Sequence, residues 1–386
     1  MNVPKLRFKE FNDEWNYNSL SNYVERIITK NKNNESNLVL TISAQYGLVD
    51  QVKFFNRKVS SSNISGYYLL NNGDFAYNKS YSNGYPWGAI KRLNNYNQGV
   101  VSSLYICFRP KNNIDSDYLE QYFETNKWYR QVSEISVEGA RNHGLLNIAV
   151  NDFFETKHYI PSIMEQAKIG QTLQLLDKKI ELQTKKIETL KLFKSYTKSE
   201  IFKNGNHVCK LGAILNKWNK KNKDGAINYV ESISNKAGFI PQSEQFEDRN
   251  VASKNLRNYY VIKKGVFGYN PSRLNVGSLA LKENDFISVV SPLYECFTTT
   301  QNNTYLFEWF NSNNFKKETF SKFEGGVRNT LNFNNLCDIP INLPDIETQN
   351  QYAKYFNKIN FKISLEEQKL SELVKFKKGL LQEMFI

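Results

Sequence analysis

The sequence predicts an α/β (α+β) chain built as a tandem duplication: a globular unit and a long helix, followed by a second globular unit and a second long helix. Two observations support this fold class. The stretch from Ile187 to Phe202 returns 183 positions later as Leu370 to Phe385. The segments that precede the two copies also match, although more faintly. A pattern repeated over such a distance indicates an internal repeat.

The repeated block extends from Pro161-Ser-Ile-Met-Glu-Gln166, which matches Pro344-Asp-Ile-Glu-Thr-Gln349. Proline is favoured in the first turn of a helix, where its missing N–H has no partner to lose. Apolar residues then recur in alternating steps of four and three, as in a coiled coil. They are Ile169, Leu173, Leu176, Ile180, Ile187 and Leu190, and in the second copy Tyr352, Phe356, Ile359, Ile363, Leu370 and Leu373. Each copy is therefore expected to be one helix of roughly 60 Å.

Both apolar seams are interrupted at equivalent places, where Gln183 matches Glu366 and Lys194 matches Lys377. A parallel pairing would place the two lysines opposite each other in an apolar seam. An antiparallel pairing separates them, brings Gln183 opposite Glu366 and returns Phe385 toward the first globular unit. The sequence therefore favours antiparallel helices, with Gln183 and Glu366 setting their register. The alternative is two unrelated amphipathic helices in separate cores, and the coinciding interruptions favour the paired helices over it.

The repeat sets four expected boundaries: globular units over 1–160 and 204–343, and helices over 161–203 and 344–386. An approximate two-fold axis would relate the two halves. Within the globular units, β-rich runs predict strands at 38–42, 100–108 and 286–290. Short amphipathic helices are expected at 117–123 and 305–310. Three pairs of matching segments support the duplication: 43–49 with 234–240, 54–59 with 246–251, and 73–78 with 265–270.

The charge balance indicates a polyanionic partner, because 51 Lys and Arg against 38 Asp and Glu leave a formal charge of +13. Nucleic acid is the first expectation, followed by an acidic membrane surface or an acidic protein. The N-terminal residues contain no apolar stretch that suits a signal peptide or a membrane span, which predicts a cytoplasmic protein without a membrane partner. The four cysteines are scattered and predict neither disulfides nor a zinc site.

Motifs for catalysis and cofactor binding are missing from the sequence. It contains no G-x-G, no G-K-[ST] and no adjacent prolines, which excludes the dinucleotide fingerprint, the P-loop and the N-P-P-aromatic motif of adenine methyltransferases. The three histidines stand far apart in the sequence. We therefore expect a non-catalytic chain that binds no metal or cofactor itself.

Several loops are instead rich in Tyr, Asn, Lys and Arg, residues that contact phosphates and base edges. The predicted DNA contacts in the first half are Tyr46, Arg57, Tyr77, Asn78, Lys79, Lys91, Arg92, Arg141 and Asn142. Those in the second half are Lys236, Arg249, Tyr269, Asn270, Arg273, Arg328 and Asn329. Arg141-Asn142 and Arg328-Asn329 lie in paired Gly-x-Arg-Asn loops. Arg57 and Arg249 could equally be structural arginines.

The order of these features resembles the specificity (S) subunit of type I restriction-modification systems. The resemblance covers essentially the whole chain: the opening Pro4-Lys-Leu-Arg-Phe-Lys-Glu-Phe…Trp15, two variable domains, the Gly-x-Arg-Asn loops and two Pro-x-Ile…Gln helices. It implies that the variable domains are target-recognition domains, each reading half of a split sequence in double-stranded DNA. The second half lacks a counterpart of the Tyr-Pro-Trp-Gly stretch at 85–88, which leaves its contact residues less defined.

The resemblance further implies that the helices set the gap between the half-sites and dock two modification (methyltransferase) subunits, with restriction (translocase and nuclease) subunits joining the complex. S-adenosylmethionine, ATP and Mg would then belong to those partners. Two alternatives remain at this stage. One is a freestanding structural DNA-binding protein, and the other is a coiled-coil scaffold whose basic charge is incidental.

Overall fold

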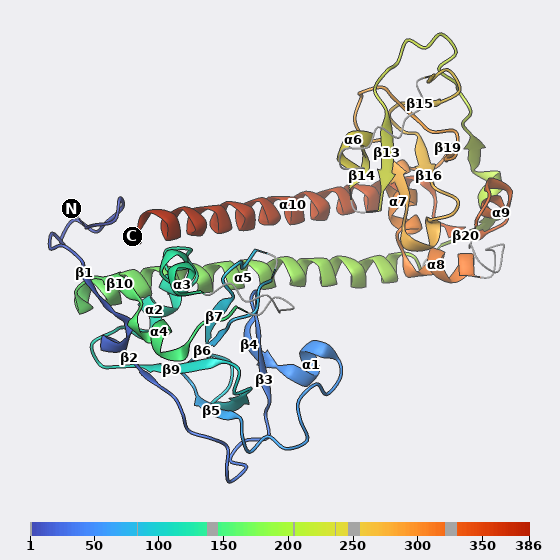
Figure 1. Cartoon of the computed structure of the whole chain (residues 1–386). Coiled ribbons are helices and arrows are strands. Elements are labelled where there is room, and N and C mark those ends of the chain that lie inside the picture. Colours follow the sequence, from blue (N-terminus) through green and yellow to red (C-terminus); the bar gives the residue numbers. More distant parts are fainter. Residues whose placement is uncertain are drawn as a thin grey trace. The chain divides into compact units, whose positions relative to one another are not determined.

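The computed structural model describes residues 2–82, 84–136, 146–203, 205–235, 237–245, 255–320 and 330–386 (Figure 1). The chain separates into two compact units. Unit 1 comprises Met1–Thr184 and Lys369–Ile386, and unit 2 comprises Lys185–Gln368. The chain passes between the units only within the two long helices, so each unit holds one globular domain and a part of both helices. None of the described helices is both long and apolar enough to cross a membrane.

Unit 1 contains a four-stranded antiparallel sheet in the order β2-β9-β6-β7 and three two-stranded pairs, β1-β10, β3-β4 and β5-β8. Its strands are β1 Asn16–Ser19, β2 Val24–Arg26, β3 Leu40–Ser43, β4 Gly47–Asp50, β5 Tyr68–Asn71, β6 Phe75–Asn78, β7 Ala89–Arg92, β8 Gln98–Val101, β9 Ile106–Pro110 and β10 Lys157–Ile160. Its short helices are η1 Leu20–Asn22, α1 Gln51–Phe55, α2 Ser116–Phe123, α3 Tyr129–Ile135 and α4 Val150–Glu155.

Unit 2 repeats this topology with the sheet β12-β19-β16-β17 and the pairs β11-β20, β13-β14 and β15-β18. Its strands are β11 His207–Lys210, β12 Leu215–Lys217, β13 Glu231–Ser234, β14 Gly238–Pro241, β15 Tyr260–Ile262, β16 Phe267–Tyr269, β17 Leu279–Leu281, β18 Ser288–Val290, β19 Glu295–Thr299 and β20 Pro340–Leu343. Its short helices are η2 Leu211–Ala213, α6 Gln242–Gln245, η3 Leu274–Val276, α7 Asn303–Phe310, α8 Asn313–Phe320 and α9 Phe333–Cys337. The predicted tandem duplication is confirmed.

The cores of the two units repeat the same aromatic packing. Phe75 stacks on Phe108 in unit 1, with ring centroids 5.3 Å apart, and Phe267 stacks on Phe297 in unit 2 at 5.0 Å. All four rings are buried. They lie on neighbouring strands of the four-stranded sheets, where cross-strand partners face the same side.

One predicted strand is divided in the structure. The run 100–108 forms the end of β8 and the beginning of β9, joined by a turn in which the Tyr105 N–H donates to the Ser102 carbonyl. The Ser102 hydroxyl accepts from the Leu104 N–H at 3.3 Å, and the Leu104 side chain is exposed. A serine side chain that accepts from the backbone two residues later favours a turn over a strand. This explains why the predicted strand is interrupted after Val101.

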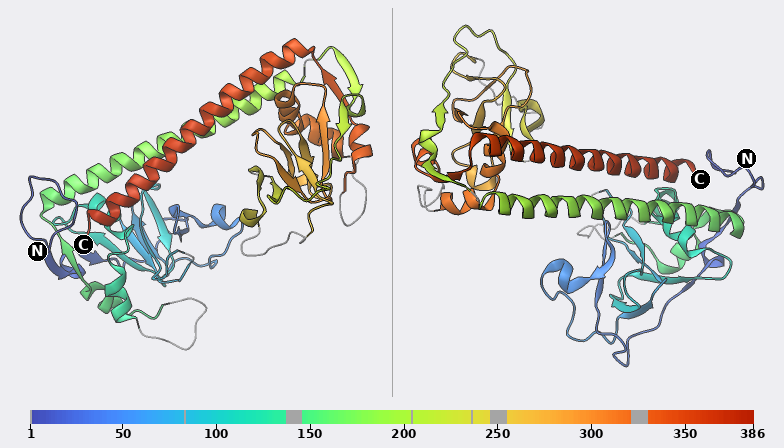
Figure 2. Two further views of the ribbon diagram at one scale, coloured as in Figure 1. Left: turned by 90° about the horizontal axis from the view of Figure 1, so that it is seen from above. Right: turned by 180° about the vertical axis from the view of Figure 1, so that it is seen from behind.

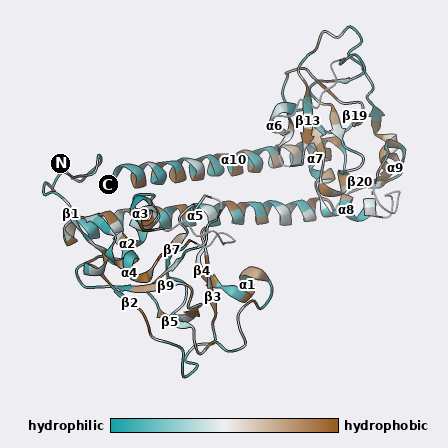
Figure 3. Ribbon diagram, in the orientation of Figure 1, coloured by the Kyte–Doolittle hydropathy of each residue, from teal (hydrophilic) through white to brown (hydrophobic). Residues whose placement is uncertain are grey.

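The long helices are α5 Ile163–Ile201 and α10 Ile346–Glu383, and they run antiparallel within each unit (Figures 1 and 2). In unit 1, Asp177 pairs with Lys377 while the earlier Leu173 shares a core with the later Phe385. In unit 2, Lys186 pairs with Glu366 and Phe202 contacts Phe356. Along both helices hydrophobic residues alternate with polar ones, as the seam predicts (Figure 3).

The ends of the long helices are anchored in the globular cores. Phe385 lies 5.4 Å from Tyr118 and 6.0 Å from Tyr122, measured between ring centroids, and is buried in unit 1. Phe202, its counterpart in the repeat, lies 5.3 Å from Tyr305 in unit 2. The Leu6 N–H also donates to the Glu383 carbonyl. The predicted return of the C-terminal helix to the first domain is confirmed.

A buried trio shows how the two cores have diverged. In unit 2, Lys282 lies 2.6 Å from Glu231, and Ser288 donates to the same carboxylate. Leu93, Leu40 and Gly99 occupy the equivalent positions in unit 1. A Cβ at Gly99 would lie 2.4 Å from Leu40 Cδ1, so the serine requires a different neighbour. Where unit 1 has the apolar residues Leu40 and Leu93, unit 2 thus has the buried ion pair of Glu231 and Lys282, whose opposite charges compensate each other.

His158 on β10 is held neutral within unit 1. Its Nδ1 lies 2.7 Å from the Tyr122 hydroxyl and its Nε2 lies 2.8 Å from the Thr156 hydroxyl. Desolvation by burial lowers the pKa of His158 to about 3. In the unfolded chain an ordinary histidine takes up a proton near pH 6.5.

Unit 1 should consequently lose stability as the pH falls below about 6.5, because the unfolded state binds a proton that the folded state refuses. Between pH 6.5 and 5 this amounts to about 2 kcal/mol. We expect His158→Asn to reduce this pH dependence and His207→Asn, at an exposed histidine, to leave it unchanged. Urea unfolding of unit 1 at pH 6.5 and pH 5 measures this loss of stability. If the free energy of unfolding fell by the same amount in the wild type and in His158→Asn, His158 would not be its source.

Candidate nucleic-acid interface

The β3-β4 turn presents an aromatic side chain at the surface of unit 1. Tyr46 is 68% exposed, and its N–H donates to the Ser43 hydroxyl at 3.2 Å. Gly47 follows with φ +77°, a conformation that glycine adopts at little cost. Gly238 holds the equivalent position in the β13-β14 turn with φ +71°. The sequence match of 43–49 with 234–240 therefore corresponds to two equivalent hairpins.

Helix α1 follows the β3-β4 hairpin and buries none of its residues. Asp50 caps its N-terminus by accepting from the Val52 and Lys53 N–H groups, and Asn56 ends it with φ +50°. The helix exposes Phe54 and Phe55. Lys53, Arg57 and Lys58 are exposed beside them. We call Gln51 to Lys58 the α1 ridge. Exposed aromatic rings flanked by cations are suited to a DNA duplex, which offers phosphates to the cations and apolar groups such as thymine methyls in the major groove to the rings.

A depression of about 350 Å³ lies between the β3-β4 turn and the segment that follows β6. The aromatic residues lining it are Tyr46, Phe54, Tyr81 and Tyr85. Asn78 also lines it, with its side-chain oxygen accepting from the Ser80 N–H. The structure thus brings the predicted residues Tyr46 and Asn78 to one concave surface. Phe54, Phe55 and Tyr81 are also exposed and were not among the contacts predicted from the sequence, although the cations flanking an aromatic pair at 53–58 were an available signal.

Tyr77 and Tyr269 are not surface residues, and their prediction as DNA contacts is wrong. Both are fully buried on the central strands β6 and β16, which places them in the cores. The Tyr77 hydroxyl donates to the Trp87 carbonyl at 2.7 Å. Burial raises the pKa of both phenols. The Phe-x-Tyr pattern at 75–77 and 267–269 therefore marks equivalent positions in the two cores and not a common binding site.

Two of the predicted cations in unit 1 are neutralised within the chain. Lys91 is buried and pairs with Glu124 at 2.5 Å. Arg92 pairs with Asp117 at 2.7 Å and Glu120 at 2.6 Å. These ion pairs tie β7 to α2 and its C-cap residue Glu124, so Lys91 and Arg92 have a structural role, and their contact with DNA stays a prediction. Sequence alone could not show which carboxylates would face them.

The remaining predicted contacts differ in their surroundings. Lys79 donates to the Ile148 carbonyl at 3.1 Å, and desolvation lowers its pKa, so it too is engaged within the chain. Asn270 is half-buried, and its side-chain oxygen accepts from the Ser272 N–H. Arg273 is exposed. Arg141, Asn142, Lys236, Arg249, Arg328 and Asn329 lie outside the described residues.

Of the two residues predicted to set the register of the helices, Gln183 and Glu366, the second is buried. Glu366 is 5% exposed and lies 2.9 Å from Lys186 within unit 2. Gln183 is half-buried on α5, and its pairing with Glu366 stays a prediction. Among the described residues, no group of three or more His, Cys, Asp or Glu side chains is arranged to hold a metal ion.

Solved structures of similar fold are known. An S subunit of a type I restriction-modification system from M. genitalium aligns over 100% of this chain and 99% of its own, with a TM-score of 0.59 and 14% identity. The chain has the fold of a type I S subunit. A second structure, from work on complex assembly and conformational transition of the type I R-M system, aligns over 98% of this chain and 99% of its own, with a TM-score of 0.55 and 13% identity.

The likeness lies in the fold, since no protein-family model matches the chain and no curated protein matches it in sequence. Coverage of nearly all of both chains means that the S-subunit fold includes both globular domains and both long helices. The resemblance inferred from the order of the sequence motifs is confirmed at the level of fold.

Proposed function

We propose that this chain is the DNA sequence-recognition subunit of a type I restriction-modification enzyme. The observation that carries the proposal is the duplicated architecture: two domains of one topology, each joined to the same two long helices, over the full length of an S-subunit fold. A duplicated reader joined by helical spacers suits a DNA target made of two half-sites. The freestanding DNA-binding protein and the coiled-coil scaffold are not favoured.

In this proposal each globular domain reads one half-site and the helices set the gap. The chain itself performs no chemistry. Modification subunits, two per chain, would bind S-adenosylmethionine and methylate adenine, while restriction subunits would use ATP and Mg. The complex would act on double-stranded DNA in the cytoplasm. The net charge of +13 supports a DNA partner.

The test is to express the chain with its adenine methyltransferase subunit in a host that lacks DNA methylation, and to map N6-methyladenine across the genome. We expect one split motif, with two short constant blocks separated by a fixed unspecified gap. A soluble complex that copurifies yet leaves no motif would overturn sequence recognition and favour the scaffold. Failure to copurify with any methyltransferase would instead favour the freestanding DNA-binding protein.

Within unit 1 we propose the α1 ridge and the β3-β4 turn as the DNA-contacting surface. The triple variant Lys53→Gln/Arg57→Gln/Lys58→Gln should weaken DNA binding and flatten its salt dependence. If all three cations contact phosphates, the slope of log K against log salt should fall by about 2.7. Binding of a fluorescent duplex, followed from about 50 to 200 mM salt, measures this.

A matched control removes the same charge elsewhere in unit 1. Lys5, Lys9 and Arg130 are exposed, and the triple change of these residues to Gln should leave the salt slope nearly unchanged. Equal losses for both triple variants would show that net charge, and not the α1 ridge, governs binding.

A further inference from the structure

Three polar side chains meet in unit 1 where the end of α10 contacts α2 and α5. Lys377 Nζ lies 2.5 Å from Asp177 Oδ1, and Gln121 Nε2 donates to Asp177 Oδ2 at 2.8 Å. Gln121 is buried, and the Lys377 side chain is 16% exposed. The lysine therefore enters the protein and is neutralised by the carboxylate on α5.

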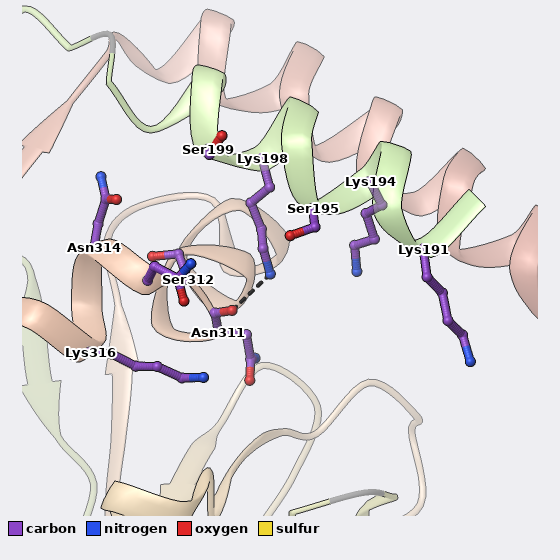
Figure 4. A pocket seen from close by; sticks show the side chains of 10 residues that line it. Lys191, Lys194, Ser195, Lys198, Ser199, Asn311, Ser312, Asn314 and Lys316 are labelled. Carbon is purple, nitrogen blue, oxygen red and sulfur yellow. Dashed lines mark hydrogen bonds between the residues drawn. The ribbon is translucent and has the colours of Figure 1, made fainter. Parts of the chain in front are cut away.

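Unit 2 contains the corresponding junction with its polar groups redistributed. Lys194 Nζ lies 2.6 Å from Glu308 Oε1, and Asn360 Nδ2 donates to the same oxygen at 3.1 Å. Glu308 on α7 is buried. Figure 4 shows Lys194 and Lys198 projecting from α5 toward the segment that contains Asn311 and Ser312.

The two junctions occupy equivalent positions in the repeat. Lys194 and Lys377, like Asp177 and Asn360, are 183 positions apart. Gln121 and Glu308 fall at the same place in α2 and α7, because Tyr118 and Tyr305 precede each by three residues and Phe123 and Phe310 follow by two. The lysine is thus retained, while the carboxylate and the amide have exchanged elements.

A fourth position accompanies the exchange. Lys198 lies 3.3 Å from Glu308 Oε2 and donates to the Asn311 carbonyl at 2.8 Å. Its counterpart in the repeat is Leu381, which packs against the core of unit 1. The Gln121 Oε1 atom, which stands in place of a Glu308 oxygen, has no hydrogen-bond partner among the described residues. The second lysine, Lys198, is therefore found in unit 2, where the buried residue is Glu308, and is replaced by Leu381 in unit 1, where the buried residue is Gln121.

Physical chemistry accounts for this covariation. A buried carboxylate is costly unless a cation and hydrogen bonds compensate for its lost hydration. In unit 2 the lysines hold the pKa of Glu308 below its ordinary value in spite of burial. In unit 1 the carboxylate is that of Asp177, whose side chain is more exposed than that of Glu308. Lys377 alone is therefore enough to compensate its charge.

We infer that these four positions form a polar latch that docks the last turns of each long helix on a globular domain and so positions the domain on the helix. The latch residues are Gln121, Asp177, Lys377 and Leu381 in unit 1 and Glu308, Asn360, Lys194 and Lys198 in unit 2. The latch works with the carboxylate on either element, provided that the amide moves to the other element and the Leu381/Lys198 position changes with it, while the first lysine is retained. This inference does not depend on the proposed function.

The test moves the carboxylate within unit 1 of the full chain. Asp177→Asn should lower the folding equilibrium constant of unit 1 about tenfold, because Lys377 loses its carboxylate. The triple variant Gln121→Glu/Asp177→Asn/Leu381→Lys reproduces the arrangement of unit 2 and should restore stability to within about threefold of wild type. Hydrogen exchange across residues 377–383 should rise in the single variant and return in the triple variant.

The reciprocal variant Glu308→Gln/Asn360→Asp/Lys198→Leu should be tolerated in unit 2, whereas Glu308→Gln alone should not. Glu134→Gln, which removes an exposed carboxylate on α3, serves as the matched control and should leave hydrogen exchange unchanged. Rescue by either triple exchange supports the latch. The inference is overturned if both triple variants are as unstable as the single ones, or if Asp177→Asn alone has no effect.

Discussion

Replacing Phe385 with alanine is expected to destabilise unit 1 by about 3 to 5 kcal/mol. Phe385 is 2% exposed and packs against Tyr118 and Tyr122, so the variant would leave a cavity where α10 enters the core. Unfolding should be followed for the two units separately by hydrogen exchange in urea, because they need not unfold in one transition.

Phe376, on α10 nine residues before Phe385, provides the matched control. Its side chain is 60% exposed, so Phe376→Ala should change the stability of unit 1 by no more than about 0.5 kcal/mol. Phe202→Ala should destabilise unit 2 as Phe385→Ala destabilises unit 1, since the two phenylalanines hold equivalent places. Equal small effects of Phe385→Ala and Phe376→Ala would show that the end of α10 does not anchor in the first domain.

Deleting one heptad from each long helix is expected to abolish methylation of the original DNA target. The chain passes between the units only within α5 and α10, so under the proposed function helix length determines the gap between half-sites. Removal of 179–185 and 369–375 shortens each helix by about 10 Å and keeps the apolar seams in phase. The new motif should retain both half-sites with a gap shorter by about three base pairs.

Methylation mapping of the deletion variant, in the same host as the wild type, measures this change. The control deletes 179–185 alone, which leaves helices of unequal length and should reduce the yield of soluble complex. A double deletion that still methylates the original motif would show that the helices do not set the gap. Altered half-sites with an unchanged gap would assign sequence reading to the helices rather than to the globular domains.

The sequence was informative wherever the signal was periodic or repeated. The heptad seams, the shared interruptions and the recurrence of 73–78 at 265–270 predicted two antiparallel helices and two related domains. A helix is stabilised by contacts between residues three and four positions apart, and its apolar stripe must be covered, so such patterns can be read along the chain.

The candidate site was predicted less well, because its chemistry depends on contacts between distant residues. Tyr77 and Tyr269 looked like loop residues beside Asn, yet their strands carry them into the cores. Lys91 and Arg92 looked like phosphate contacts, but α2 and its C-cap residue bring three carboxylates, those of Asp117, Glu120 and Glu124, within ion-pair distance of them. The exposed aromatic pair at Phe54 and Phe55 became evident only once α1 was seen to bury nothing.

By itself, then, the sequence determined that this chain is duplicated, that its helices are long and antiparallel, and that a polyanion is the expected partner. Only the tertiary structure decided which polar residues are available to that partner. Lys194 and Lys377 illustrate the difference: the repeat marked them as equivalent interruptions, whereas folding supplies each with a carboxylate from a different element. Each of these two lysines is compensated by a residue 100 or more positions away, and no local pattern records such a contact.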